Sequence, residues 1–261
     1  MSKEKIVLVA LIILIFGAIF WFIFSSNLTG VTNSDSQPID HHLFTEILSQ
    51  YVNQDGWVDY QSLGRNREKF DEYLKLLSSH HPNQAHWSVA QQKAYWINAY
   101  NAFTLQLILN HPSVKSIKEL GGAIYRVNTA WDIEFINIEG HRYDLNDIEH
   151  NILRKNYTDP RIHFALNCAS RSCPELRREA YEADQLDAQL DDAGKRFLSD
   201  PNKNKITENH IQISRVFKWF PGDFTQDGDL IDFLNKFSNI KISEDADIDY
   251  LEYDWGLNKV H

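Results

Sequence analysis

The chain has 261 residues, with 36 acidic and 26 basic side chains and a formal net charge of −10. This acidic balance argues against a general nucleic-acid binder, which would present a basic face. A hydrophobic content of 43% is enough for a packed core, and the length fits one or two domains.

Residues 6–24 form an apolar run, IVLVALIILIFGAIFWFIF, close to the roughly 20 residues that span a bilayer. Lys3 and Lys5 precede the run, which favours a cytoplasmic N-terminus and an exported remainder. A cleaved signal peptide would have a shorter apolar region, and FSSN at residues 24–27 is a poor cleavage site. We therefore expect residues 1–26 to be an uncleaved, single-pass anchor in the inner membrane, with a globular domain facing the periplasm or the cell exterior.

The exported part is predicted to begin with a linker. Residues 27–38, NLTGVTNSDSQP, are polar and rich in turn-forming residues, which predicts a flexible stalk. Residues 39–261 are then one globular domain. Its first elements are amphipathic helices, predicted at residues 42–51 and 66–79 from the spacing of their apolar side chains.

The stretch Ser88–Asn110 is the longest predicted helix of the domain. Ser88 and Gln91 form a capping-box pattern at its start, and a proline closely follows its end. It is apolar on nearly all sides, which is typical of a buried core helix. Two amides on one face, Asn98 and Asn101, need hydrogen-bond partners if that face is buried. Either they tie neighbouring segments to the helix, or one of them lines an active site.

Short strands and helices are predicted downstream of this helix. Alternating apolar and polar residues predict a hairpin at residues 131–143, and Asn146 begins a helix with a second capping-box pattern. Strand patterns follow at residues 161–166, 206–213 and 216–220, and helical patterns at residues 183–198 and 230–237.

The densest cluster of polar side chains lies in residues 146–174. A nucleophilic thiol needs a cation, a helix N-terminus or a partner histidine to lower its pKa. Cys168 stands in a turn rich in Ser and Arg, where backbone amides can converge on an anion, and His163 and His150 are equal candidates for its base. The residues expected in catalysis are Cys168, His163, His150, Glu149 and Asn98. Those expected in binding are Asn101, Ser170 and Arg171.

Other interpretations of this cluster stay open. Cys168 and Cys173 can pair in an oxidising compartment, and a disulfide would exclude thiolate catalysis by both. Glu149 can simply complete a capping box, and His150 with Arg154 can form a surface pair one helical turn apart. The cysteines and histidines have the donor types that zinc prefers, but their spacing matches no standard zinc pattern. We therefore expect no metal and no cofactor.

Five segments of the chain resemble segments of the domain-of-unknown-function 547 family, and they occur in the same order as in that family. They read AYWINAYNAFTL, LNDIEHNILR, DPRIHFALNCASRSCPEL, ISRVFKWFPGDF and YDWGLN. The similarity runs from about Leu43 to Asn258. The resemblance implies an α+β domain that is often exported in bacteria, and it implies no established reaction.

The chain is also similar, more weakly, to papain-like and transglutaminase-like folds, which pack a long central helix against a small antiparallel sheet. In those enzymes the nucleophilic cysteine begins that helix, and a histidine and an acid or amide lie on following strands. This chain departs from the pattern, because Asn98 or Asn101 stands in the corresponding region and both cysteines lie downstream of His163. The likeness implies either a rearranged site with Cys168 as nucleophile or the fold without that chemistry.

Together, these patterns predict an α+β fold in which a long buried central helix packs against a small antiparallel sheet with surrounding helices, preceded by one transmembrane helix. The leading function is a membrane-tethered envelope protein acting as a cysteine-dependent hydrolase or transferase on an amide-type bond. The alternative is a non-catalytic envelope module that binds a protein partner or a small ligand through the same cleft. Expected partners are the membrane, through residues 6–24, and an unknown protein or small amide-containing ligand, but no nucleic acid. Asn98 or Asn101 is expected to hydrogen-bond into the segment His163–Cys173.

Overall fold

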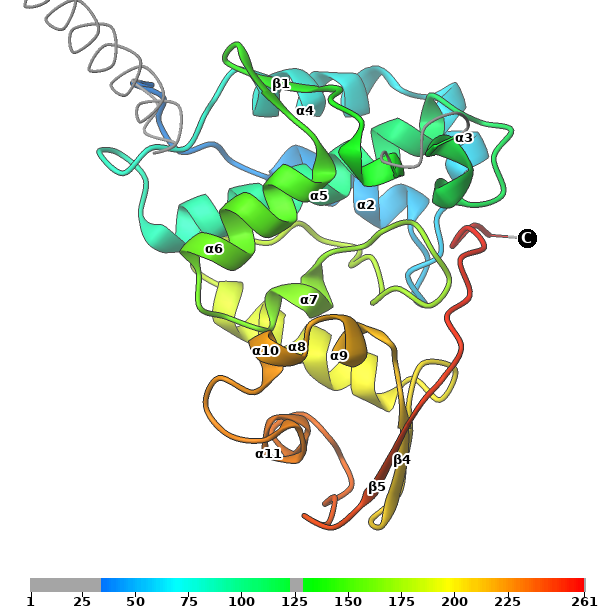
Figure 1. Cartoon of the computed structure of the whole chain (residues 1–261). Helices are drawn as coiled ribbons and strands as arrows, with labels where there is room; N and C mark the ends of the chain where they lie inside the picture. Colours follow the sequence, from blue (N-terminus) through cyan, green and yellow to red (C-terminus); the bar gives the residue numbers. More distant parts are fainter. Residues whose placement is uncertain (1–33, 123–128, 261) are drawn as a thin grey trace, which may run out of the picture.

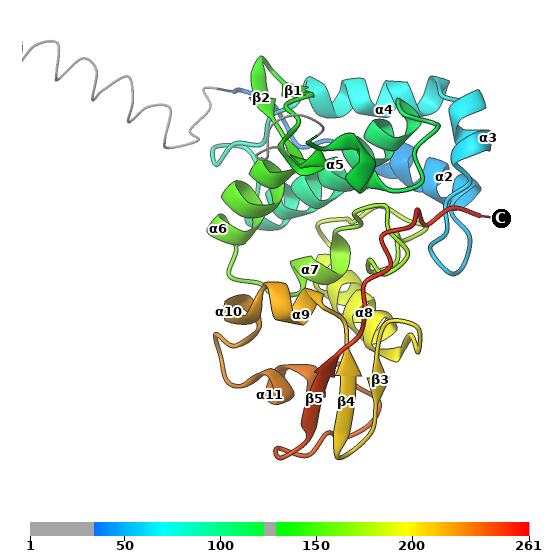
Figure 2. The same cartoon turned by 45° about the vertical axis from the view of Figure 1, so that its right-hand side comes forward.

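The structure, a computed structural model, describes residues 34–122 and 129–260. The predicted anchor and most of the predicted stalk therefore lie outside the described residues. Two packed halves form the domain (Figure 1, Figure 2). In the first half, helices α2, α3, α4 and α6 lie around the central helix α5. In the second half, a small sheet packs with helices α8 to α11. The C-terminal tail runs back from the sheet to the first half (Figure 2).

The first half is mostly helical. Its helices α2 and α4 confirm the predictions at residues 42–51 and 66–79, and its hairpin confirms the turn predicted within residues 131–143. Its elements are α2 (His42–Tyr51), α3 (Tyr60–Arg65), α4 (Glu68–Ser78), α5 (Val89–Leu109), η1 (Ile117–Leu120), η2 (Ala130–Asp132), β1 (Ile136–Ile138), β2 (His141–Tyr143), the π-helix η3 (Asp147–Leu153) and α6 (Arg154–Asn156).

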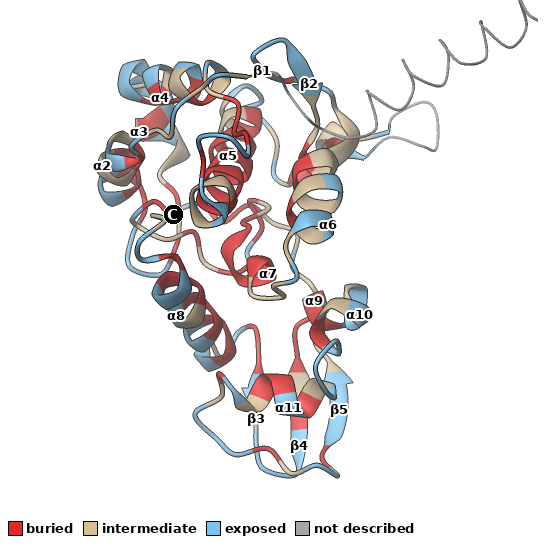
Figure 3. Ribbon diagram, turned by 90° about the vertical axis from the view of Figure 1, so that its left-hand side faces the viewer, coloured by how far each residue is buried: buried red, intermediate tan, exposed pale blue. Residues whose placement is uncertain are grey.

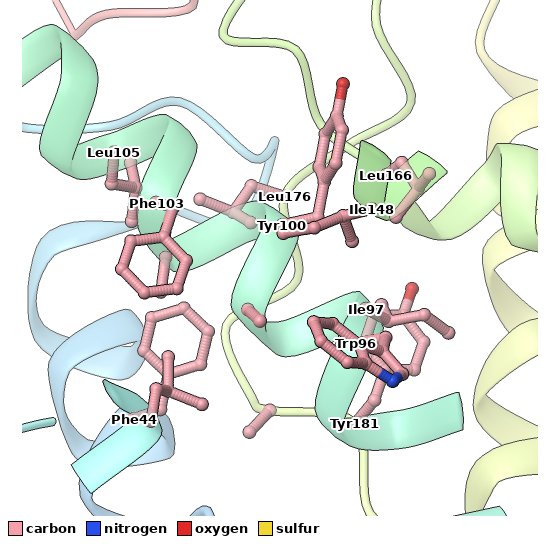
Figure 4. Packing of buried hydrophobic residues seen from close by; sticks show 14 of the residues in the cluster. Phe44, Trp96, Ile97, Tyr100, Phe103, Leu105, Ile148, Leu166, Leu176 and Tyr181 are labelled. Atoms are coloured by element: carbon pink, nitrogen blue, oxygen red, sulfur yellow. The ribbon is translucent and has the colours of Figure 1, made fainter. Parts of the chain in front are cut away.

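The central helix α5 is buried along almost its whole length (Figure 3). The predicted capping box is present, because the Ser88 side chain accepts from the Gln91 amide while the Gln91 side chain accepts from the Ser88 amide. Its Trp96, Tyr100 and Phe103 side chains pack into one apolar cluster with neighbouring segments (Figure 4). Removing this much apolar surface from water is the main force that holds the first half together.

The second half combines a three-stranded sheet with short helices. Strand β4 pairs antiparallel with β3 and parallel with β5, so the sheet is mixed. Its core is rich in phenylalanine and is separate from the cluster around α5. The elements are α7 (Ile162–Ala165), α8 (Leu186–Ser199), β3 (Lys205–Ile206), β4 (His210–Ile213), α9 (Val216–Trp219), α10 (Pro221–Phe224), α11 (Leu230–Asn235) and β5 (Asp247–Tyr250).

The expected fold class is corrected on two points. The three-stranded sheet is mixed rather than antiparallel, and it covers the second core instead of packing against α5 (Figure 2). Nor does any helix within residues 34–122 and 129–260 have the length and apolar character needed to cross a membrane, and the expected span at residues 6–24 lies outside these ranges.

Two predicted strands are helices instead. Residues 161–166 contain α7, because Asp159 accepts a hydrogen bond from the Arg161 amide at 3.1 Å and so begins a helical turn at Pro160. Residues 216–220 contain α9, which begins where Ser214 accepts from the Val216 amide. Both apolar runs are too short for periodicity to separate strand from helix. The predicted Asn146 cap is also absent, and a turn divides the strand predicted at residues 206–213 into β3 and β4, which pair antiparallel. Helices α8 and α11 confirm the helices predicted at residues 183–198 and 230–237.

The short helix α7 fastens the two halves to each other. Ile162 and Ala165 pack into the core around α5, while Phe164 packs among the phenylalanines of the second core. His163 lies between them and is itself buried. A four-residue helix clamped from both sides holds its histidine in one orientation, and this sets the position of the site described below.

Stability should depend on pH through His41. This residue is buried, and its Nδ1 lies 2.7 Å from the Tyr73 hydroxyl. Burial lowers the pKa of His41 from 6.5 to about 4, against a smaller opposing effect of Asp40. The unfolded chain takes up the proton first, so the contribution of His41 to stability is complete above pH 6.5 and is lost as the pH falls through 4.

We therefore expect the free energy of unfolding of the wild type to fall by up to about 3 kcal/mol more than that of His41→Gln across this pH range. Urea unfolding at each pH measures it. Parallel pH profiles for the two proteins would contradict this origin of the pH dependence.

Candidate functional site

A cavity of about 190 Å³ lies between the two halves, beside α7. One side comes from α5, η3 and the segment after α7, and the other comes from α9 and the C-terminal tail. Six aromatic side chains line it, with the candidate polar residues among them. The aromatic residues are Tyr100, Trp131, Trp219, Phe220, Tyr253 and Trp255, and the polar or sulfur-bearing ones are Asn146, Glu149, His150, His163, Cys168 and Cys173.

An ion pair between Asp223 and Arg154 links the two histidines of the cavity, His163 and His150. His163 Nε2 lies 2.7 Å from Asp223 Oδ2, and Arg154 donates two hydrogen bonds to the same carboxylate, at 2.6 and 2.9 Å. Arg154 Nη1 in turn lies 3.1 Å from His150 Nδ1. Burial alone would raise the pKa of Asp223, but the hydrogen bonds from His163 and Arg154 outweigh it and hold that pKa well below its usual range. Asp223 is therefore a fixed negative charge that orients the His163 ring.

Phe220 completes the support of His163. The two rings stack with centroids 4.2 Å apart, and the Arg154 guanidinium lies 4.7 Å from the Phe220 centroid. With Nε2 held by Asp223, the Nδ1 atom is the one directed toward Glu149, whose Oε1 lies 3.9 Å away. That distance is too long for a hydrogen bond.

Glu149 presents the carboxylate of the cavity. It lies in the wide turn of the π-helix η3, a feature that often occurs at functional sites, and its side chain is 12% exposed. Tyr100 is its neighbour from α5: burial raises the pKa of Tyr100 well above its usual value, and the Glu149 carboxylate adds to the rise. The Trp131 indole N–H donates to the Tyr100 hydroxyl at 3.2 Å, which joins the aromatic wall to this pair.

Cys168 and Cys173 form a disulfide. In this form neither sulfur is a thiolate, so the nucleophile expected at Cys168 is absent from the site. The Tyr253 hydroxyl lies 3.3 Å from Cys168 Sγ and donates to Cys173 Sγ at 3.2 Å. Neither His163 nor His150 has a hydrogen bond to sulfur in the part of the chain that the structure describes.

The two amides of α5 are confirmed as ties to neighbouring segments. Asn101 donates to the carbonyl of Ala165 at 2.9 Å and accepts from the amide of Asn167 at 2.8 Å, so it binds into the segment His163–Cys173 as expected. Asn98 makes the same pair of bonds to the backbone of Tyr181, at 2.8 and 2.9 Å. Both amide side chains form their hydrogen bonds with backbone groups, and Asn98 does not line the cavity.

The two remaining predicted binding residues, Ser170 and Arg171, both line a second, larger cavity of about 780 Å³. Ser170 is buried, lies 3.2 Å from Cys168 Sγ and donates to the Tyr253 hydroxyl at 3.2 Å. Arg171 pairs with Asp254 at 3.3 Å. The structure therefore places neither Ser170 nor Arg171 in the lining of the aromatic cavity, although Ser170 contacts two of its lining residues, Cys168 and Tyr253.

Several residues of the site were not singled out from the sequence. Asp223 and the aromatic residues of α9 and the C-terminal tail are distant in sequence from the cluster at residues 146–174. The signal that pointed to them was their presence in ISRVFKWFPGDF and YDWGLN, two of the segments that carry the family resemblance.

This arrangement offers three chemical capabilities. An oriented histidine can accept a proton, a carboxylate among aromatic rings can bind a cation, and a disulfide beside a cavity can react with a thiol. Within residues 34–122 and 129–260, no group of three or more His, Cys, Asp or Glu side chains is arranged to hold a metal ion.

Comparison with known proteins places part of this site in one family. Residues 84–198 match the model of the family described as "Protein of unknown function, DUF547". No curated protein and no solved structure matches the chain. The match includes α5, η3 and the disulfide loop, whereas α9, α10 and the tail lie beyond it. The likeness to papain-like folds stays a prediction.

Replacing Asn101 by alanine should loosen the attachment of the disulfide loop. The change leaves the buried Ala165 carbonyl and Asn167 amide without these partners, and we expect a loss of about 2–4 kcal/mol in the free energy of unfolding. Gln106→Ala, a half-exposed amide on the same helix, should cost less than about 0.5 kcal/mol. Urea unfolding of both variants measures the difference, and equal losses would contradict the role of Asn101.

Proposed function

Through residues 84–198 the chain belongs to the DUF547 family, and from the aromatic cavity beside α7 we infer that it binds a small organic ammonium ion. The observation that carries this proposal is one carboxylate, Glu149, enclosed by six aromatic side chains in a cavity of about 190 Å³. A cavity of this size suits a small molecule rather than a folded partner. This proposal develops the non-catalytic alternative expected from the sequence.

The aromatic side chains pack against one another along the wall of the cavity. Trp255 lies 5.6 Å from both Trp219 and Trp131, centroid to centroid, and 4.5 Å from Tyr253. Aromatic faces attract a cation through the negative charge at their centres, with Trp the strongest. The protein already uses one of these rings in this way, since Lys118 Nζ lies 5.0 Å from the Trp255 centroid.

The charges around the cavity favour a positive ligand. Arg154 is neutralised by its two hydrogen bonds to Asp223. Glu149 forms no ion pair with an Arg or Lys within the described ranges. Its Oε1 lies 3.9 Å from His163 Nδ1, and Arg154 is near enough to interact with it electrostatically. A carboxylate in such a setting gains from an ammonium ion, because little water remains to screen the interaction.

A second candidate function is the thiol-dependent attack on an amide bond. It is favoured by one observation: Asp223 orients His163 as it would orient a general base. The disulfide opposes it, because a Cys168 thiolate exists only after reduction. This activity is therefore proposed for the reduced protein alone.

Cation binding can be measured by isothermal titration calorimetry with choline and its uncharged isostere, 3,3-dimethylbutan-1-ol. The two ligands have the same shape, so any difference between them reports the charge. We expect choline to bind at least about tenfold more tightly, and Glu149→Gln to weaken choline binding by about tenfold with no effect on the alcohol.

Glu134→Gln is the matched control, since this glutamate is exposed on the surface and its loss should leave both affinities unchanged. Equal binding of choline and the alcohol, or no binding of either, would overturn the proposal.

The thiol-dependent activity is tested with the variant Cys173→Ala. This variant frees the Cys168 thiol without a reductant. If His163 activates Cys168, iodoacetamide should alkylate the thiol at a rate that already levels off below about pH 7, and His163→Gln should move that midpoint upward. A thiol that reacts only above about pH 8 would exclude the cysteine enzyme.

A further inference from the structure

We propose that the Cys168–Cys173 disulfide is a thiol–disulfide exchange site, at which a small thiol enters the aromatic cavity, attacks Cys168 Sγ and releases Cys173. This inference goes beyond ligand binding and does not depend on the charge of the ligand. It depends on three features of the loop: the exposure of the two cysteines, the hydrogen bonds to Cys173 and the attachment of the loop ends.

The two cysteines differ in exposure. Both line the aromatic cavity, and Cys173 also lines the larger cavity, but Cys168 is partly exposed whereas Cys173 is 3% exposed. Exchange requires the attacking thiolate to reach one sulfur in line with the bond that breaks, so access selects the sulfur that is attacked. The cavity volume admits a small thiol, and Cys168 is the more exposed of the two residues.

The hydrogen bonds select Cys173 as the leaving group. Its Sγ accepts from the Cys168 backbone amide at 2.9 Å and from the Tyr253 hydroxyl at 3.2 Å. Burial raises the pKa of Tyr253 well above its usual value, so that hydroxyl keeps its proton and remains a donor. Donors aimed at a sulfur stabilise the negative charge that develops when it leaves, and a better-stabilised thiolate leaves faster.

The loop does not need the disulfide to hold its shape. The Asn167 side chain bridges its two ends, donating to the Pro174 carbonyl at 2.7 Å and accepting from the Ala169 amide at 2.9 Å. The second contact also holds Ala169 in the left-handed region, at φ 59°. On its outer side, the Arg171 amide donates to the Gly256 carbonyl of the tail at 2.8 Å.

A disulfide that closes so short a loop removes little freedom from the unfolded chain. The same hydrogen bonds keep Cys173 beside Cys168 after the bond has opened. The loop is therefore built to open and close without unfolding its surroundings.

The atoms and electrons of the proposed step balance with the entering thiol as the sole co-reactant. The thiol first loses its proton to solvent. Its sulfur then bonds to Cys168 Sγ as the Cys168–Cys173 bond breaks, and the electron pair of that bond passes to Cys173 Sγ. The entering sulfur is oxidised to a mixed disulfide, and Cys173 is reduced to a thiolate. Attack by this thiolate on Cys168 Sγ reverses the step and releases the thiol.

Trapping the mixed disulfide and the released thiol shows which of the two sulfurs is attacked. The unreduced full chain is treated with 2-mercaptoethanol under native conditions, quenched with iodoacetamide and digested with trypsin. Cleavage after Arg171 places the two cysteines on separate peptides. We expect mercaptoethanol on Cys168 and the carbamidomethyl group on Cys173, in at least about tenfold excess over the reverse pattern.

An equal or reversed distribution would overturn the assignment, as would a disulfide that reacts only after urea is added. The probe is uncharged, so failure here leaves the ammonium proposal untouched, and failure of choline binding leaves this result untouched.

Variants of two tyrosines test the leaving-group role. Tyr253→Phe removes one donor from Cys173 Sγ and should slow the exchange by about fivefold. Tyr250→Phe, on strand β5, removes a hydroxyl that has no contact with the loop among the contacts described, and should leave the rate within about twofold. Circular dichroism checks that both variants are folded. Equal rates for Tyr253→Phe and the wild type would contradict the assignment.

Discussion

The site depends on the amide side chain of Asn101. A buried amide must form its hydrogen bonds within the protein, and here it forms them with the two backbone groups that flank Leu166. The central helix thus fixes the chain at the point where α7 ends and the disulfide loop begins. Asn98 clasps the backbone of Tyr181 in the same manner three residues earlier. These amides shape the site without facing the ligand.

The cavity exists because two cores meet at α7. The first core supplies Tyr100 and Glu149, and the C-terminal elements supply the tryptophans and the carboxylate that orients His163. Polar side chains at this boundary are satisfied mainly by one another, through the chain from His163 to Asp223, Arg154 and His150. Glu149 differs, because it forms no ion pair with an Arg or Lys within the described ranges. We propose that its charge among the aromatic rings gives the cavity a preference for cations.

The sequence predicted those features that short-range physics determines. The capping box and unbroken apolar run of α5 determine a buried helix, and burial of Asn101 then requires a partner in the chain that crosses it. The helix α7 was predicted as a strand, because a run of four residues is too short for its periodicity to separate helix from strand. Asp223 was not predicted, since only the folded chain brings it 2.7 Å from His163. Whether the cysteines pair depends on the turn between them, which spacing alone does not fix.

Locating the bound ligand shows whether an ammonium ion is held among the aromatic side chains beside Glu149. Indole N–H resonances of the seven tryptophans can be followed by NMR while the ¹⁵N-labelled full chain is titrated with tetramethylammonium. The structure predicts saturable shifts of Trp131, Trp219 and Trp255, and no shift of Trp57 and Trp87, which do not line the cavity. Shifts confined to Trp57 and Trp87, or no saturable shift at all, would contradict it.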